Sequence, residues 1–261
     1  AQNRELEIEA ALEKVRSRTM AMQHSDELGE VSFVLDSQVR ALGIKTRGCA
    51  FNIYGENEST EWFSSQKGTL PVYKRPREKT FLRYYEAGQK GESLFIKEFS
   101  GKACVTHYEY LCTLPVMGKA LKQMIADGGS FPEQQIDHAA YFKYGYLLFI
   151  TLEPCPQAHD IFKRFAKVFE QTYTRFLDLK KAEAQAREAE IELALERIRA
   201  RTMAMHKSDE LPGVATIVFE KLRELSFSVI EGAVVILIFK EGSRDYTQWI
   251  ADPGHTYPNY F

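Results

Sequence analysis

Two stretches of the chain carry apolar residues spaced alternately four and three positions apart. This spacing averages about 3.5 residues, which is typical of a left-handed coiled coil whose seam residues enter holes on a partner helix. Charged residues flank each seam, so the apolar stripe is as narrow as a coiled coil requires. We therefore predict coiled-coil helices over residues 1–24 and 179–207. Their seams consist of Ile8, Leu12, Val15, Thr19 and Met22 in the first helix, and of Ile191, Leu195, Ile198, Thr202 and Met205 in the second.

The two stretches are copies of one another. Residues 1–28 align with residues 184–211 without a gap, and 20 of the 28 aligned pairs are identical. Arg-Thr-Met-Ala-Met and Ser-Asp-Glu-Leu stay in register, which two unrelated helices rich in alanine and glutamate would not do. We interpret this as an internal repeat. The alternative to a coiled coil, for either copy, is an amphipathic helix that lies on its own domain.

The residues between the copies alternate between helical and strand-like patterns. Apolar residues at helical spacing over 28–42 end at Gly43, a residue type that commonly caps the C-terminus of a helix. Gly88 is expected to end a later helix in the same way. Glycine and prolines predict a loop over 66–76. The predicted helices are 28–42, 77–87, 102–112, 116–126 and 158–207, and the predicted strands are 49–54, 60–64, 93–99, 134–142 and 146–152.

A second unit begins after the second copy. A helix is predicted over 214–225 and strands over 232–239 and 246–250, in the same order as in the first unit. The pattern stops there, before the remaining strands and a closing helix. We therefore expect one α+β domain over 25–178 and the N-terminal part of a second over 208–261. The chain is expected to be a piece of a longer repeating protein, with a partner shielding the incomplete sheet.

Over 25–178 the predicted order is helix, two strands, helix, strand, two helices, two strands and a long helix. This order resembles that of a GAF domain, with the PAS domain as the nearest alternative. The resemblance implies an antiparallel sheet covered on one face by its first and last helices, with a ligand pocket on the other face. The repeated helix beside such a domain is similar to the linkers of bacterial multidomain (two-component type) sensor proteins, in which GAF-type modules stand upstream of a histidine kinase or cyclase.

Composition and charge argue against several classes of function. Of the 261 residues, 44% are hydrophobic and 27% charged, and the net charge of −2 leaves no basic excess for nucleic acid or an anionic membrane surface. The apolar runs are far shorter than the roughly 20 residues of a membrane span, and no signal peptide is visible. The four cysteines lack CxxC spacing, which indicates reduced thiols and a cytoplasmic protein.

No catalytic motif emerges from the sequence. It contains no glycine-rich phosphate loop, no GxSxG and no HExxH. His24 is followed by an acid, as in the phosphoacceptor segment of a histidine kinase, but the aligned residue of the second copy is Lys207. We therefore predict a non-enzymatic segment without a metal or cofactor, and we expect any output enzyme to lie outside these residues.

Five residues are candidates for contact with a small molecule. Cys104 and His107 share one face of a predicted helix, although two ligands are too few for a zinc site. Bilin-binding GAF domains use a cysteine near a histidine, so a chromophore or haem sensor is one alternative, and a buried thiol beside a partly buried imidazole is the other. His138 alternates with apolar residues and is either a core histidine or a polar group of a pocket. Trp62 and Tyr108 combine an apolar ring with a polar atom, which suits a ligand pocket.

These observations predict a non-catalytic sensory segment of a dimeric cytoplasmic signalling protein. The first domain would sense an unidentified small molecule, and the helix closing its sheet would pass the change onward. The expected partner is a second copy of the chain, bound through a parallel coiled coil. The alternative is a structural dimerisation scaffold whose domain has lost its pocket. A cavity of several hundred Å³ would favour sensing over that alternative.

Overall fold

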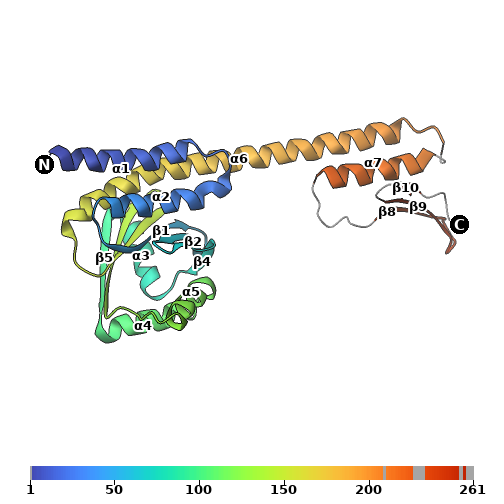
Figure 1. The fold of residues 1–261 in the computed structure, drawn as a ribbon. Helices are drawn as coiled ribbons and strands as arrows, with labels where there is room; N and C mark the ends of the chain where they lie inside the picture. Colours follow the sequence, from blue (N-terminus) through green and yellow to red (C-terminus); the bar gives the residue numbers. More distant parts are fainter. Residues whose placement is uncertain (1, 208–209, 226–232, 253–254, 257–261) are drawn as a thin grey trace. The chain divides into compact units, whose positions relative to one another are not determined.

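The computed structural model describes the chain except for residues 1, 208–209, 226–232, 253–254 and 257–261. The chain divides into two compact units, Ala1–Lys180 and Lys181–Phe261. Figure 1 shows that each unit combines helices with a sheet. The division falls close to residue 178, where the sequence predicts the end of the first domain.

The first unit is an antiparallel sheet with helices on both faces (Figure 1). All of its strand pairs are antiparallel, in the order β3-β2-β1-β7-β6-β5, and β4 also pairs with β2. The predicted mixed class, with an antiparallel sheet flanked by helices, is therefore confirmed. The helices are α1 (Gln2–Met20), α2 (Leu28–Ala41), α3 (Lys79–Gln89), α4 (Gly101–Leu111), α5 (Pro115–Ala126) and α6 (His159–Met203), with short 3-10 turns at Ser25–Glu27 and Pro156–Ala158. The strands are β1 (Thr46–Tyr54), β2 (Glu58–Ser65), β3 (Gly68–Thr69), β4 (Tyr73–Pro76), β5 (Leu94–Ser100), β6 (Gln134–Phe142) and β7 (Gly145–Thr151).

Alternation along the strands gives this sheet two buried faces. On β1, Phe51 belongs to the core formed with α1, α2 and α6, whereas its neighbour Ala50 belongs to the core under α3, α4 and α5. On β7, Phe149 and Leu148 divide in the same way. Because successive side chains of a strand point to opposite faces, the central strands contribute to both cores.

The predicted loop over 66–76 contains two short strands instead, so that prediction was wrong. β4 pairs with β2, with Tyr73 opposite Glu61 and Arg75 opposite Ser59. Proline in the segment does not prevent this pairing, because β4 bonds to a neighbour on one side only, and such edge positions tolerate a missing N–H. The extra strand brings Tyr73 and Arg75 beside Glu61.

Gly88 was expected to end a helix, but it lies inside α3. A Cβ atom at this position would stand 2.3 Å from the hydroxyl oxygen of Tyr54 and 2.9 Å from the ring of Tyr141. The glycine therefore lets α3 lie close to the sheet. The left-handed glycine that follows this helix is Gly91, with φ of 80°.

The first copy of the repeated helix, α1, lies on its own unit. The five seam residues are buried, and all of them except Thr19 share one core with α2, α6 and the sheet. Arg164 of α6 also forms ion pairs with Glu5 and Glu9 of α1. For this copy the structure corresponds to the alternative interpretation, because the seam predicted to face a partner helix is covered within the chain. The residues concerned are Ile8, Leu12, Val15, Thr19 and Met22.

The second unit resembles the start of the first in its order of elements. It contains the rest of α6, then α7 (Leu211–Glu224), β8 (Val234–Phe239), β9 (Tyr246–Asp252) and β10 (His255–Thr256). The strands form one antiparallel sheet in the order β10-β9-β8. The helix predicted over 214–225 and the strands are confirmed, except that residue 232 of the first strand lies outside the described residues. The described core consists of Ala215, Phe219, Trp249 and Ala251.

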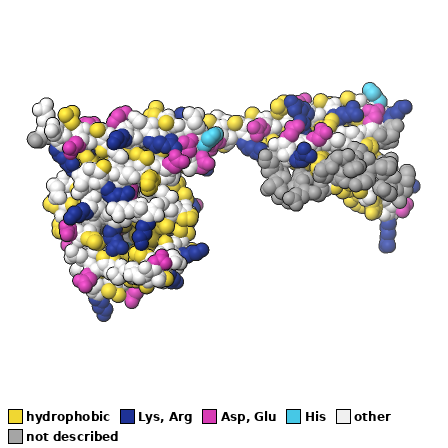
Figure 2. Space-filling model, viewed as in Figure 1, with side chains coloured by type: hydrophobic (Ala, Val, Ile, Leu, Met, Phe, Trp, Pro, Cys, Tyr) yellow, Lys and Arg dark blue, Asp and Glu magenta, His cyan; other side chains and the backbone are white. Residues whose placement is uncertain are grey.

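The seam of the second copy is more open than that of the first. Leu195 and Thr202 are exposed, and Ile191, Ile198 and Met205 are half-buried. The coiled-coil interface predicted for these residues stays a prediction. None of the described helices is both long and apolar enough to cross a membrane. On the face seen in Figure 2, acidic and basic side chains are interspersed along the helices.

Candidate ligand-binding site

A cavity of about 430 Å³ lies in the first unit between the sheet and helices α4 and α5. Its volume falls within the range of roughly 300–1,000 Å³ that small-molecule sites occupy. The walls are mainly apolar, and the floor on the sheet carries several polar side chains. The apolar lining comprises Phe63, Leu70, Phe81, Leu111, Met117, Ala120, Leu121, Met124, Leu148 and Ile150.

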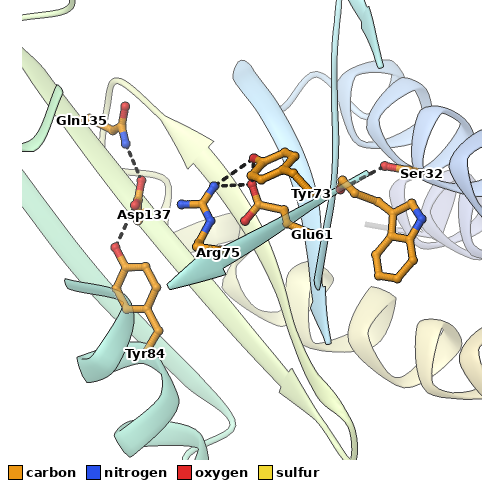
Figure 3. A network of polar contacts seen from close by, with 8 residues as sticks. Ser32, Glu61, Tyr73, Arg75, Tyr84, Gln135 and Asp137 are labelled. Atoms are coloured by element: carbon orange, nitrogen blue, oxygen red, sulfur yellow. Dashed lines mark hydrogen bonds and ion pairs between the residues drawn. The ribbon is translucent and has the colours of Figure 1, made fainter. Parts of the chain in front are cut away.

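One end of the polar floor is a buried ion pair between Glu61 of β2 and Arg75 of β4. Their exposed fractions are 0% and 4%. Arg75 Nη2 and the Tyr73 hydroxyl both donate to Glu61 Oε1, and Arg75 Nη2 also lies 3.0 Å from the Tyr73 hydroxyl (Figure 3). The Arg75 guanidinium lies 4.1 Å from the centroid of the Phe81 ring, at cation–π distance. Tyr73 and Phe81 therefore hold the Glu61–Arg75 ion pair in its orientation.

The ion pair leaves polar atoms unused. Among the described residues, Glu61 Oε2 and Arg75 Nε are buried and have no hydrogen-bond partner. Buried polar groups of this kind are rare in folded proteins, because each costs on the order of 1–3 kcal/mol when it is left unsatisfied. Both residues line the cavity, so a bound molecule is one means of satisfying them.

The other end of the floor is a chain of hydrogen bonds centred on Asp137 of β6. Gln135 Nε2 donates to Asp137 Oδ1 at 2.7 Å, and the Tyr84 hydroxyl donates to Oδ2 at 2.7 Å (Figure 3). The Tyr108 hydroxyl donates in turn to Gln135 Oε1. Burial raises the pKa of Asp137 to about 6, although the bonds from Tyr84 and Gln135 lower it. This carboxyl therefore changes charge in weakly acidic solution.

Two of the five candidate residues line the cavity. Tyr108 is buried there, stacked on Phe131 at a centroid distance of 4.8 Å. His107 stacks on Phe99 at 4.2 Å, and burial, assisted by the positive charge of Arg75, lowers the pKa of its imidazole to about 4. At neutral pH His107 is therefore an uncharged ring that offers one donor and one acceptor.

Cys104 is buried on the same helix but is not part of the cavity wall. Its thiol donates to the carbonyl oxygen of Pro132 at 3.3 Å. Burial raises the pKa of this thiol, and the negative charge of Asp137 adds to the effect. A protonated, hydrogen-bonded thiol is a poor nucleophile and a poor metal ligand. Of Cys104 and His107, only His107 lines the cavity.

Trp62 and His138 lie on the opposite face of the sheet and do not line this cavity, so their predicted contact with a ligand stays a prediction. Trp62 packs near Phe176 of α6, with ring centroids 6.3 Å apart. His138 lies 5.3 Å from the ring of Phe162, and its Nε2 is 3.0 Å from Thr151 Oγ1. Burial, assisted by His159, lowers the pKa of His138 to about 4. Of the two alternatives left open by the sequence, the structure thus corresponds to the core histidine.

The residues that sequence reasoning missed are the direct neighbours of those it chose. Glu61 adjoins Trp62, and Asp137 adjoins His138, so strand alternation turns each acid toward the cavity. One signal was available, since each acid stands inside a predicted strand next to an apolar or aromatic residue, Trp62 beside Glu61 and Ile136 beside Asp137. Arg75 carried no such signal, because its segment was interpreted as loop.

Comparison with known proteins adds no identification. No protein-family model matches the chain, and no curated protein matches it either. Within the part of the chain that the structure describes, no three histidine, cysteine, aspartate or glutamate side chains cluster closely enough to hold a metal ion.

Proposed function

We propose that the chain is a non-catalytic sensory segment whose first unit binds a small molecule in the cavity under α4 and α5. The observation that carries this proposal is the 430 Å³ cavity with apolar walls and a buried polar floor. A domain serving only as a scaffold would gain stability by filling such a space with side chains. The GAF-like character suggested by the order of elements belongs to the same proposal, as does a cytoplasmic signalling protein around it.

The lining indicates the chemistry of the ligand. Apolar walls favour an aromatic or aliphatic body. The floor presents two carboxyl groups, Glu61 and Asp137, beside the buried guanidinium of Arg75, and Arg47 and Lys67 line the cavity as well. Glu61 Oε2 is the buried acceptor without a partner. In the described part of the chain Arg75 Nε is a buried donor without a partner, so a ligand that both donates a hydrogen bond to Glu61 Oε2 and accepts one from Arg75 Nε would be favoured.

The relay part of the proposal rests on the strands that separate the cavity from α6. Leu148 of β7 lines the cavity, and the next residue, Phe149, stacks on Phe162 of α6 at a centroid distance of 4.1 Å. A ligand that shifts β6 and β7 would thus act on α6, which continues unbroken to Met203. Such a relay requires two arrangements of α6 that differ in ligand affinity. A histidine kinase is one downstream output that this relay would suit.

The predicted homodimer is a separate part of the proposal. Because the seam of α1 is covered within the chain, a parallel coiled coil would have to use the second seam, on α6. Ligand binding in the cavity does not depend on such a dimer.

Methionine methyl groups offer a direct test. Met117 and Met124 line the cavity, whereas Met20 and Met203 are exposed and lie outside it. We would label the methyl groups of the full chain with ¹³C and titrate naphthalen-2-ylmethanamine, the matching alcohol and naphthalene-2-carboxylate. We expect resonance shifts at Met117 and Met124, with the alcohol, which can both donate to Glu61 Oε2 and accept from Arg75 Nε, binding most tightly.

A matched pair of variants provides the control. Ala120→Trp places a ring in the cavity, and Ala126→Trp adds the same ring at the exposed end of α5. Binding should be lost in the first variant and kept in the second. If all three probes leave Met117 and Met124 unshifted, the scaffold alternative is preferred. If they shift while Met205 in the second unit stays unchanged, binding stands and the relay fails.

A further inference from the structure

The second unit leaves open a helix face that the first unit covers. Leu12 of α1 has an exposed fraction of 3%, whereas its equivalent Leu195 on α6 has 39%. The two seams are nearly identical in sequence, with only Val15 and Ile198 differing. Their different exposure must therefore come from what surrounds them.

In the first unit the covering element includes the start of α6. Ile161, Phe165 and Val168 belong to the same core as the seam of α1. Ile161 also lines one groove together with Ile8 and Arg164. In the described residues of the second unit, the buried cluster is formed by α7 and the strands alone. An equivalent of the start of α6 is thus missing from the second unit as described.

The open face keeps the charges that recognise this covering helix. In the first unit, Arg164 of α6 lies 2.7 Å from Glu5 and also pairs with Glu9. The repeat preserves both acids, as Glu188 and Glu192. These two are exposed, and among the described residues neither receives an ion pair. The second copy therefore retains an arginine-binding pair of carboxylates without its arginine.

We propose that this face, formed by Glu188, Ile191, Glu192, Leu195 and Ile198, docks an amphipathic helix of the α6 type. The occupant is a helical polypeptide that presents an arginine within an apolar stripe. In the first unit that stripe is given by Ile161, Arg164, Phe165 and Val168. Helices of this kind bind in grooves through apolar residues three and four apart, with charges setting the register. The proposal does not depend on ligand binding in the cavity.

A second copy of the same helix fits this face less well. Glu188 stands three residues before Ile191 and thus extends the seam. In a parallel coiled coil with an identical helix, the two Glu188 side chains would meet at the interface, where like charges oppose pairing. An arginine-bearing helix replaces that repulsion with an ion pair. Charge complementarity therefore favours an α6-type helix over a second α6 seam.

The test is binding of a fluorescein-labelled peptide with the sequence of residues 158–180 to the full chain, followed by fluorescence anisotropy. The Glu188→Lys/Glu192→Lys double variant should bind the peptide about ten-fold more weakly than the native chain, since two attractions become repulsions. The peptide carrying Arg164→Glu should reverse this order and prefer the double variant. Glu196→Lys changes an exposed acid of the same helix outside the seam and should leave binding unchanged.

Three results would overturn the proposal. One is binding no stronger than that of a scrambled peptide. Another is equal affinity for the native chain and the double variant, which would place the peptide elsewhere, for instance on the first unit. The third is a native chain that sediments as a dimer and becomes monomeric on Ile198→Ser, which would assign the face to a second copy.

Discussion

The two copies of the repeated helix share their local contacts and differ in their burial. Arg4 donates to the carbonyl of Leu42 at the end of α2, and Arg187 donates to the carbonyl of Leu225 at the end of α7. The Thr202 hydroxyl bonds to the carbonyl of Ile198, as the Thr19 hydroxyl does to Val15. Yet the seam is buried in the first copy and open in the second. Local contacts thus follow the helix sequence, whereas burial follows the neighbours that the rest of the fold supplies.

The break after each helix is also kept. Glu27 Oε1 accepts from the backbone N–H groups of Gln23 and His24, at 2.7 and 2.8 Å. In the second copy Glu210 Oε1 accepts from His206 N at 3.4 Å. The glutamate of Ser-Asp-Glu-Leu therefore holds the chain where one helix ends and the next begins. Both copies thus keep the same kind of contact at the glutamate of this motif.

The largest expected difference between the copies is the effect of truncating one leucine. Leu12→Ala removes a buried side chain from the first core and should lower the free energy of unfolding of that unit by about 2–5 kcal/mol. Leu195→Ala removes a partly exposed side chain and should cost less than about 1 kcal/mol. Urea unfolding measures both, because each unit holds a single tryptophan, Trp62 or Trp249.

Each tryptophan reports on its own unit when the other is replaced by phenylalanine. Equal losses of unfolding free energy in Leu12→Ala and Leu195→Ala would contradict a difference in burial between the two copies. We expect Leu195→Ala to cost little alone and much more when the α6-type peptide is present. Such a result would show that the peptide buries Leu195 as the start of α6 buries Leu12.

A second, smaller effect should be confined to the first unit and concerns Asp137. Its pKa is about 6 when folded against 3.8 when unperturbed, so the folded state holds the proton more tightly. The carboxyl therefore costs stability as pH rises from about 4 to 6, by at most about 3 kcal/mol once it is fully ionised. Asp137→Asn does not titrate. Relative to this variant, the native first unit should lose stability over that pH range.

Urea unfolding of the native and Asn variants at pH 4.5 and 7, in a Trp249→Phe background, checks this expectation. The lowered pKa values of His107 and His138 act in the opposite direction, but they are present in both proteins and cancel in the difference. The second unit, followed through Trp249, should not distinguish the variants. A pH-independent difference would contradict a raised pKa for Asp137.

The smallest expected effect is one that the two copies share. Arg4→Met and Arg187→Met each remove a guanidinium that caps a helix carbonyl. Each should cost its own unit about 1 kcal/mol, because the bond is only partly shielded from water. The same two urea titrations measure the losses. Unequal losses would show that the two arginines form equivalent hydrogen bonds that contribute differently to the free energy of unfolding.

His107 and Tyr108 of the candidate site were named from the sequence, but the polar centre of the site was not. Tyr108 and His107 were predicted as ligand contacts, and both line the cavity. Trp62 and His138 were predicted as ligand contacts too, but they lie on the other face of the sheet. A strand buried on both sides does not reveal which face carries a pocket. Alternate residues of the same strands face the core beside α6 and the cavity beside α4.

Arg75 shows why the remaining part could not be predicted. Its partner Glu61 is 14 residues away, and the two meet only because β4 adds to the edge of the sheet. Glycine and proline at 68, 71 and 76 indicated a loop, and local propensity contains no information about which edge is free. Gly88 presents the same problem, since its close approach to Tyr54 depends on how α3 lies on the sheet.

Taken alone, the sequence determined the repeat, the positions of the helices and of most strands, and the seams of the repeated helix, because these depend on spacing along the chain. Tertiary structure decided which seam is covered, which face of the sheet holds the cavity, and which acids lie on its floor. The reason is physical. Period and propensity are local, whereas burial and ion pairing depend on segments far apart in the chain, such as Glu5 and Arg164. The repeated helix therefore has one sequence pattern and two environments.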